Sequence, residues 1–290
     1  MKYILITGAS SGIGFYACRF LLDKGYFVFG TVRTEEDRKR LMNSFPGNFE
    51  ALLLDLTSKT SISKIENYLK KKLDKTGLFA LINNAGIAYG GPMMHVSDED
   101  FEMQMNTNLN SVFYLSKALL PLLGASFNSN YQPGRIVNIS SVSGLINTPM
   151  LGPYCISKHA LESLSDILRR ELALFGVKVV LLAPGPIKTP IWEKSIPKNN
   201  PLKGTDYENI YHVFSKRVNK SAKNALPVEV VSKYISKALE KTNPSPRYII
   251  SKNKLAIKII HNFIPTKWMD KLFVSQLKKS IEFIIPKSKN

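Results

Sequence analysis

Two residues in the middle of the chain carry side chains that together can transfer a proton. Tyr154 and Lys158 lie four residues apart in a segment of helical periodicity, so their side chains share one helix face, with Cβ atoms about 5 to 6 Å apart. A tyrosine is a poor base at neutral pH, but a neighbouring ammonium favours its phenolate and lowers its pKa. The pair predicts a general acid–base group, Tyr154, assisted by Lys158.

A glycine-rich turn near the N-terminus has the composition of a phosphate-binding loop. It reads Thr7-Gly8-Ala9-Ser10-Ser11-Gly12-Ile13-Gly14 and joins an apolar run to a helical stretch. Glycine permits positive φ and a close backbone approach, and the first N–H groups of a helix attract anions. A tight strand-to-helix turn needs glycine even without a nucleotide, but the position after the first strand favours a dinucleotide.

Arg33 bears on which dinucleotide is bound. It follows the second apolar run, where dinucleotide sites read the adenosine ribose. An acid at this place accepts a hydrogen bond from the 2′-OH of NAD, whereas an arginine can pair with the 2′-phosphate of NADP. The sequence therefore favours NADP(H). NAD(H) stays the alternative, because Arg33 can also be a solvated surface residue and three acids follow at 35–37.

Apolar runs of strand length alternate with stretches of helix length and place these residues. The runs lie at 3–6, 26–29, 50–54, 78–82, 135–139, 177–182 and 247–250, and the helical stretches at 12–24, 59–74, 98–125, 153–175 and 227–241. Unbroken β-branched runs are typical of strands covered on both faces. We therefore expect an α/β fold, a Rossmann-type doubly wound parallel sheet that forms a single domain over residues 1–251.

Two segments depart from this alternation. Residues 190–226 are polar and weakly periodic, which indicates a mobile lid over a substrate site. Residues 252–290 place apolar side chains among lysines and form a basic amphipathic C-terminal extension. This tail can lie on an anionic membrane surface, fold back on the domain or pack against a second subunit.

The motifs occur in the order and at the separations found in one known family. They comprise Thr7 to Gly14, Asp55-Leu56-Thr57, Asn83-Asn84-Ala85-Gly86, Asn108, Ser140-Ser141, Tyr154-Cys155-Ile156-Ser157-Lys158, and Pro184-Gly185-Pro186-Ile187-Lys188-Thr189. Over residues 1–190 the chain resembles the short-chain dehydrogenases/reductases of the branch with TGxxxGxG, NNAG and YxxxK signatures. The stretch from Tyr154 to Val179 is most similar to the retinol and hydroxysteroid dehydrogenases, which implies a lipophilic substrate.

The resemblance implies an oxidoreductase and a role for each matching residue. A hydride would pass between NADP(H) or NAD(H) and a secondary alcohol or ketone, or a retinoid-like alcohol or aldehyde. The catalytic residues would be Asn108, Ser141, Tyr154 and Lys158. Cofactor contacts would come from Gly8, Ser10, Ser11, Gly12, Ile13, Gly14, Arg33, Asp55, Leu56, Asn84, Ala85, Gly86, Tyr154, Lys158, Pro184, Gly185, Ile187 and Thr189. Family members often form dimers or tetramers, so a homo-oligomer is expected.

The charge distribution suggests rival functions. The formal net charge is +18, and residues 151–290 carry 25 basic and 10 acidic side chains against 15 and 12 in residues 1–150. Such asymmetry suits an anionic partner, so a basic protein associated with a membrane or nucleic acid is one alternative. A dinucleotide-binding regulator without turnover is another. No nucleic-acid-binding motif is present, so we expect no nucleic-acid partner.

Cysteine and histidine usage narrows the class further. Cys18 and Cys155 lie far apart in expected helices, so a disulfide framework is not expected and the protein is predicted to be cytoplasmic, with a peripheral membrane contact of the tail left open. The four histidines have no ligand-like spacing to cysteines or acids, so we expect no metal site.

Overall fold

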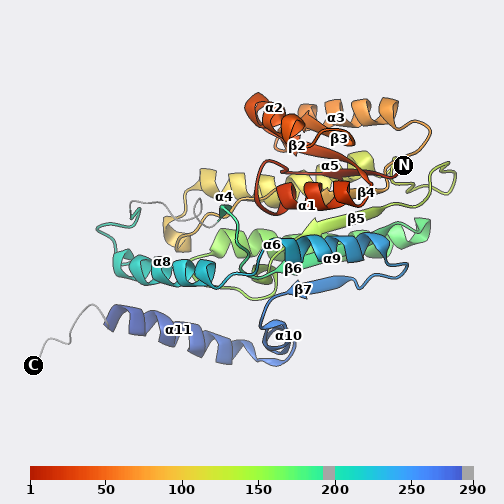
Figure 1. Cartoon of the computed structure of the whole chain (residues 1–290). Helices are drawn as coiled ribbons and strands as arrows, with labels where there is room; N and C mark the ends of the chain where they lie inside the picture. The colour runs from red at the N-terminus through yellow and green to blue at the C-terminus, as the bar shows by residue number, and fades with distance from the viewer. Residues whose placement is uncertain (192–199, 283–290) are drawn as a thin grey trace, which may run out of the picture.

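A computed structural model describes residues 1–191 and 200–282, with side chains to residue 279. Seven parallel strands form one sheet in the order β3-β2-β1-β4-β5-β6-β7. The strands are β1 (Tyr3–Ile6), β2 (Phe27–Val32), β3 (Phe49–Leu53), β4 (Ala80–Asn83), β5 (Arg135–Ile139), β6 (Lys178–Pro184) and β7 (Arg247–Ile250). The predicted α/β, doubly wound parallel sheet is confirmed (Figure 1).

Helices cover both faces of the sheet, because each strand sends alternate apolar side chains to opposite sides. Ile4 and Ile6 of β1 join one buried cluster with α1 and α9, whereas Leu5 joins a second cluster with α3 and α5. The helices are α1 (Gly12–Asp23), α2 (Glu35–Ser44), α3 (Lys59–Lys72), α4 (Asp98–Met105), α5 (Ser111–Leu119), α6 (Gly152–Leu172), α8 (Glu208–Lys223), α9 (Glu229–Glu240), α10 (Lys254–Phe263) and α11 (Thr266–Glu282).

The strand order reverses between β1 and β4, and every strand points the same way. The segments that follow the strands therefore meet along one edge of the sheet, which is where open α/β sheets bind ligands. All motif residues outside α6 and the α4–α5 segment lie on this edge or in the first turn of α1. The topology thus gathers residues that are up to about 180 positions apart in the chain.

A buried hydrogen-bond network fixes the middle of that edge. The Asn83 amide donates to Asn138 Oδ1 at 2.8 Å and to Ser116 Oγ at 3.2 Å, and the Asn138 amide donates to Ser165 Oγ at 2.8 Å. The four side chains come from β4, β5, α5 and α6. Because buried polar groups are costly unless paired, the network holds these elements in one register.

The structure corrects the interpretation of residues 190–226. Residues 192–199 lie outside the described residues. The rest of the segment contains the helix α8, although the sequence analysis found only weak periodicity there. Ile210, Tyr211 and Val218 are buried on one face of α8, and this spacing is helical. The sequence analysis also missed α2, a mostly exposed helix with only Leu41 buried.

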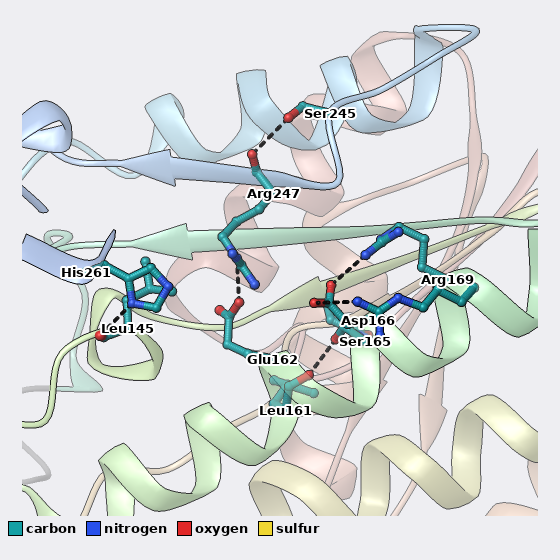
Figure 2. Close-up of polar contacts among 11 residues, drawn as sticks. Leu145, Leu161, Glu162, Ser165, Asp166, Arg169, Ser245, Arg247 and His261 are labelled. Atoms are coloured by element: carbon teal, nitrogen blue, oxygen red, sulfur yellow. Dashed lines mark hydrogen bonds and ion pairs between the residues drawn. The ribbon is translucent and has the colours of Figure 1, made fainter. Parts of the chain in front are cut away.

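The tail is helical and amphipathic, as expected, and it folds back on the domain. Helix α11 lies alongside α8 (Figure 1), and Leu277 packs against the small cluster that contains Ile210. Nδ1 of His261 on α10 lies 3.1 Å from the carbonyl oxygen of Leu145 (Figure 2). Among the described residues, no helix is both long and apolar enough to cross a bilayer.

Candidate active site

The structure brings together the four residues expected to act in catalysis. Ser141 follows β5, Tyr154 and Lys158 lie in the first two turns of α6, and Asn108 lies in a π-helical turn between α4 and α5. All four are buried, with 1 to 7% of each residue exposed. Lys158 Nζ is 5.8 Å from the centre of the Tyr154 ring. The predicted sharing of one helix face is confirmed.

Burial controls the acidity of Tyr154. It raises the pKa of the phenol to about 12, although a hydrogen bond with Ser141 works in the opposite direction. The lowering expected from neighbouring positive charge stays a prediction for the complex with the oxidised cofactor. In the protein without cofactor, the cost of removing a phenolate from water dominates. The phenol is therefore protonated at neutral pH.

The ammonium of Lys158 is fixed by the backbone at the end of β5. Its Nζ donates a hydrogen bond to the carbonyl oxygen of Ile139 at 2.9 Å. Burial lowers the pKa of the ammonium to about 8, and the carboxylate of Glu162, one turn further along α6, opposes that shift. Glu162 is fixed in turn by Arg247 of β7, whose Nε lies 2.6 Å from the carboxylate (Figure 2). Strand β7 thus influences the charge of Lys158 through Glu162.

Asn108 locks the segment that follows β4. Its Oδ1 accepts a hydrogen bond from Ile87 N, and its Nδ2 donates to Ile87 O, both at 2.9 Å. Nδ2 also donates to Ser157 Oγ on α6 at 3.0 Å. The π-helical turn places this side chain between β4 and α6, which fits a positioning role. Its expected part in a proton relay stays a prediction.

The glycine loop has the close backbone approach that a dinucleotide needs. Gly8 and Gly12 have φ of +68° and +54°, a region that only glycine adopts easily. A Cβ on Gly14 would lie 2.1 Å from the Gly8 carbonyl oxygen. Ser11 precedes α1 without capping it through its side chain, so the first N–H groups of the helix suit a pyrophosphate.

The loop is clamped to the segment after β4. Thr7 Oγ1 accepts hydrogen bonds from the backbone N–H groups of Asn84 and Ala85, at 2.9 and 3.0 Å. The Asn84 amide donates to the carbonyl oxygens of Thr7 and Gly8, at 2.9 and 3.2 Å. These bonds leave Asn84 supporting the loop. Gly86 lies between Asn108 and Lys158, since a Cβ there would be 3.2 Å from Asn108 Oδ1 and 3.6 Å from Lys158 Nζ.

The ends of β2 and β3 form the part of the sheet edge where the adenosine of a dinucleotide is expected. Arg33 directly follows β2 and is exposed. Asp55 and Leu56 follow β3, and the Asp55 carboxylate accepts bonds from Thr57 N and Thr57 Oγ1 at 2.9 and 2.7 Å. The sequence analysis missed Arg40 of α2, which donates to the Ser10 carbonyl oxygen at 2.8 Å. Only the fold brings it there.

The other end of the edge is formed by the segment after β6. Pro184 ends β6, and Gly185 N donates to Ile250 O at 2.9 Å. Ile187 forms a bridge with Leu226. Thr189 lies against the glycine loop, because a Cβ on Gly12 would be 3.3 Å from the Thr189 side chain. The segment after β6 therefore lies close to the start of α1.

A cavity of about 260 Å³ opens beside Ser141. Its lining is mostly apolar and comes from four segments: residues 141–151, Gly185-Pro186, α8 and α11. Helix α8 falls in the segment 190–226 that the sequence analysis placed over a substrate site. The contribution of α11, through Phe273, Gln276 and Leu277, was missed. No group of histidines, cysteines and acids suited to a metal ion occurs in the described part of the chain.

Comparison with known proteins gives consistent matches. A model of the short chain dehydrogenases matches residues 2–200. The chain is 43% identical over 279 residues to an NADPH-dependent 3-dehydrocapnine reductase of Ornithobacterium rhinotracheale, covering 96% of this chain and 98% of the relative. It is 31% identical to retinol dehydrogenase 16 of Mus musculus, covering 93% and 87%. The solved structure of ElxO with NADP bound has a TM-score of 0.67 at 28% identity, covering 86% and 96%.

Proposed function

The chain belongs to the short-chain dehydrogenase family of oxidoreductases, and from that membership we propose that it is an NADPH-dependent reductase of a lipophilic ketone. One observation carries the proposal: Ser141, to which the buried Tyr154 hydroxyl is bonded, lines an apolar cavity at the end of β5. The relative at 43% identity is named as an NADPH-dependent reductase. Neither the regulator nor the nucleic-acid reading is favoured.

The glycine loop and the segment after β6 fit a dinucleotide, with Gly8, Gly12 and Gly14 under its pyrophosphate and Thr189 near the nicotinamide. When bound, the reduced dinucleotide supplies the hydride. Ser141 donates a hydrogen bond to the substrate oxygen, and Tyr154 gives that oxygen its proton. Lys158 stabilises the phenolate that remains by its positive charge. The raised pKa keeps Tyr154 protonated before reduction begins, so the residue can act as the general acid.

The direction and its pH dependence can be measured together. NADPH oxidation should be followed with medium-chain ketones between pH 6 and 10, a range of about four units around the group that titrates. Since burial lowers the pKa of Lys158 to about 8, the ammonium is present below pH 8 and is lost as the pH rises through it. The value of kcat/KM for reduction should therefore be level below pH 8 and fall about tenfold per unit above it.

Glu162 provides the internal check on this pH profile. Its carboxylate opposes the loss of charge on Lys158, so Glu162→Gln should move the falling limb to lower pH. A limb at the same pH in Glu162→Gln would show that Lys158 is not the titrating group. No ketone-dependent NADPH oxidation at any pH would refute the proposed reductase.

Arg33 is proposed to select NADPH over NADH through the 2′-phosphate. Its exposed side chain follows β2, and a charge-assisted bond of this kind accounts for about 10- to 100-fold in affinity. Arg33→Ala should raise the KM for NADPH by that factor with little effect on NADH. Arg38→Ala is the matched control, because Arg38 pairs with Glu35 on the outer surface of α2. Equal losses for both dinucleotides would contradict the assignment.

We also propose that the α10–α11 hairpin contacts an anionic membrane surface. Its large apolar side chains remain exposed although α11 packs on α8, with Phe263 at 75% and Trp268 at 65%. Lysines 254, 258, 267 and 271 lie among them. Apolar side chains flanked by lysines are typical of a helix at a lipid interface.

Vesicle sedimentation tests this contact. The double variant Phe263→Ser and Trp268→Ser should bind phosphatidylglycerol vesicles less than the unchanged chain, with KM for a water-soluble ketone unchanged. Deleting the tail is unsuitable, because α11 lines the cavity. Equal binding by variant and unchanged chain would contradict the proposal. If the variant instead becomes monomeric where the unchanged chain is a dimer, the face pairs two copies.

A further inference from the structure

A second hollow adjoins the apolar cavity and is basic. Its volume is about 440 Å³, and it shares Pro186, Arg217 and Ser221 with the cavity. Its further lining includes Lys220 of α8 and Lys252 after β7. No acidic side chain lines either hollow within the described part of the chain. An apolar space that begins at Ser141 therefore continues into a cationic one.

Within residues 1–191 and 200–279, the three cations have no acidic partner. Arg217 Nη1 donates to the neutral amide of Gln276 on α11 at 3.1 Å, and Lys220 pairs with no carboxylate there. Lys252 Nζ donates to the carbonyl oxygen of Asn224 at 2.9 Å. In the described residues, none of the three is paired with a carboxylate. Three unneutralised cations around one hollow attract an anion.

We propose that the substrate is an amphiphile, an oxo compound whose ketone is joined to an acidic group through an apolar chain. The chain fills the cavity between α8 and α11, and the acidic group binds Arg217, Lys220 and Lys252. This inference rests on the proposed reductase. Arg217 is central, since it lines both hollows and its bond to Gln276 joins the two helices.

Matched ketones test the acidic group. Positional isomers of oxododecanoate, their methyl esters and the corresponding sulfonates should be compared with NADPH as reductant. The ester keeps the chain and the ketone but lacks the charge, and the sulfonate distinguishes a general anion site from one specific for carboxylate. The best acid should exceed its ester by about tenfold or more in kcat/KM, since hydrogen bonds to charged groups are worth that factor.

Variants locate the effect. Arg217→Gln and Lys220→Gln should each bring the acid-to-ester ratio of kcat/KM towards one. Lys220→Gln matters separately, because it leaves the Arg217–Gln276 bond intact. Lys216→Gln is the control: it removes the same charge from an exposed position of α8 outside both hollows, and the ratio should stay at its original value.

The failures of the two proposals are distinguishable. If ketones are reduced but acid and ester react equally, or if Lys216→Gln lowers the ratio as much as Arg217→Gln, the acidic-substrate inference is wrong and the reductase stands. If no ketone is reduced, the reductase is wrong. The inference can then be tested by titration calorimetry of oxododecanoate into the protein in the presence of NADPH. Binding that is lost in Arg217→Gln but not in Lys216→Gln supports the inference. Equal binding by both variants overturns it.

Discussion

Tyr154→Phe is expected to lower kcat for ketone reduction by about 100- to 10,000-fold, the range that general acids contribute. The substitution removes one oxygen from a buried residue whose hydroxyl bonds to Ser141. The ring stays, so the packing of α6 against the β5 end is retained. The loss should therefore appear in kcat rather than in the affinity for NADPH.

The measurement needs both turnover and cofactor binding. NADPH fluorescence titration should give a Kd within about threefold of the unchanged chain, since at most one hydrogen bond is lost on the cofactor side. Tyr68→Phe is the matched control, because it deletes a hydroxyl that bonds to Glu50 on the surface near α3. Tyr154→Phe with unchanged kcat would show that the proton comes from elsewhere.

Gly14→Ala is expected to abolish measurable NADPH binding at concentrations that saturate the unchanged chain. The added Cβ would lie 2.1 Å from the Gly8 carbonyl oxygen and 2.6 Å from Asn84 Nδ2. Both are fixed: the Gly8 carbonyl is backbone, and the Asn84 amide is held by bonds to Thr7 and Gly8. Since real Cβ contacts of this length do not occur, the loop must move away from α1, and the pyrophosphate cradle opens.

A glycine at the other end of the same helix separates this effect from general destabilisation. Gly25 has φ of +79°, and a Cβ there meets nothing within 4 Å. Gly25→Ala should cost about 1 kcal/mol of stability through its backbone conformation alone and leave the Kd for NADPH as it was. Thermal unfolding and fluorescence titration should be run on both variants. Tight NADPH binding by Gly14→Ala would mean that the cofactor does not use this loop.

The sheet and most of the site could be predicted because their signals are local. The mostly apolar runs at 135–139 and 177–182 became the adjacent strands β5 and β6. The spacing of Tyr154 and Lys158 fixed their common face. Parallel strand ends meet at one edge, so residues after different strands, such as Ser141 and Thr189, could be assigned to one site before their contacts were known.

What escaped prediction depends on contacts between distant segments. Arg40 reaches the glycine loop only because α2 packs beside it, and α11 lines the cavity only because the tail folds back on α8. The pKa of Tyr154 was expected to fall because of positive charge beside it, from Lys158 and from the oxidised cofactor. Burial, which no local pattern records, moves it in the other direction. Helix α8 did have a local signal, since Ile210, Phe214 and Val218 recur every four residues.

Because α8 and α11 line the cavity, the residues that carry out the reaction and many of those that select the substrate lie in different parts of the chain. The family match ends at residue 200, whereas Arg217, Phe273 and Leu277 come after it. Homologues that align only over the first stretch therefore inform about the redox step and about the 141–151 wall of the cavity, but not about the wall that α8 and α11 form. Chimeras that exchange the stretch from 200 onward are the direct route to redirecting the enzyme to a new compound while its hydride chemistry is left untouched.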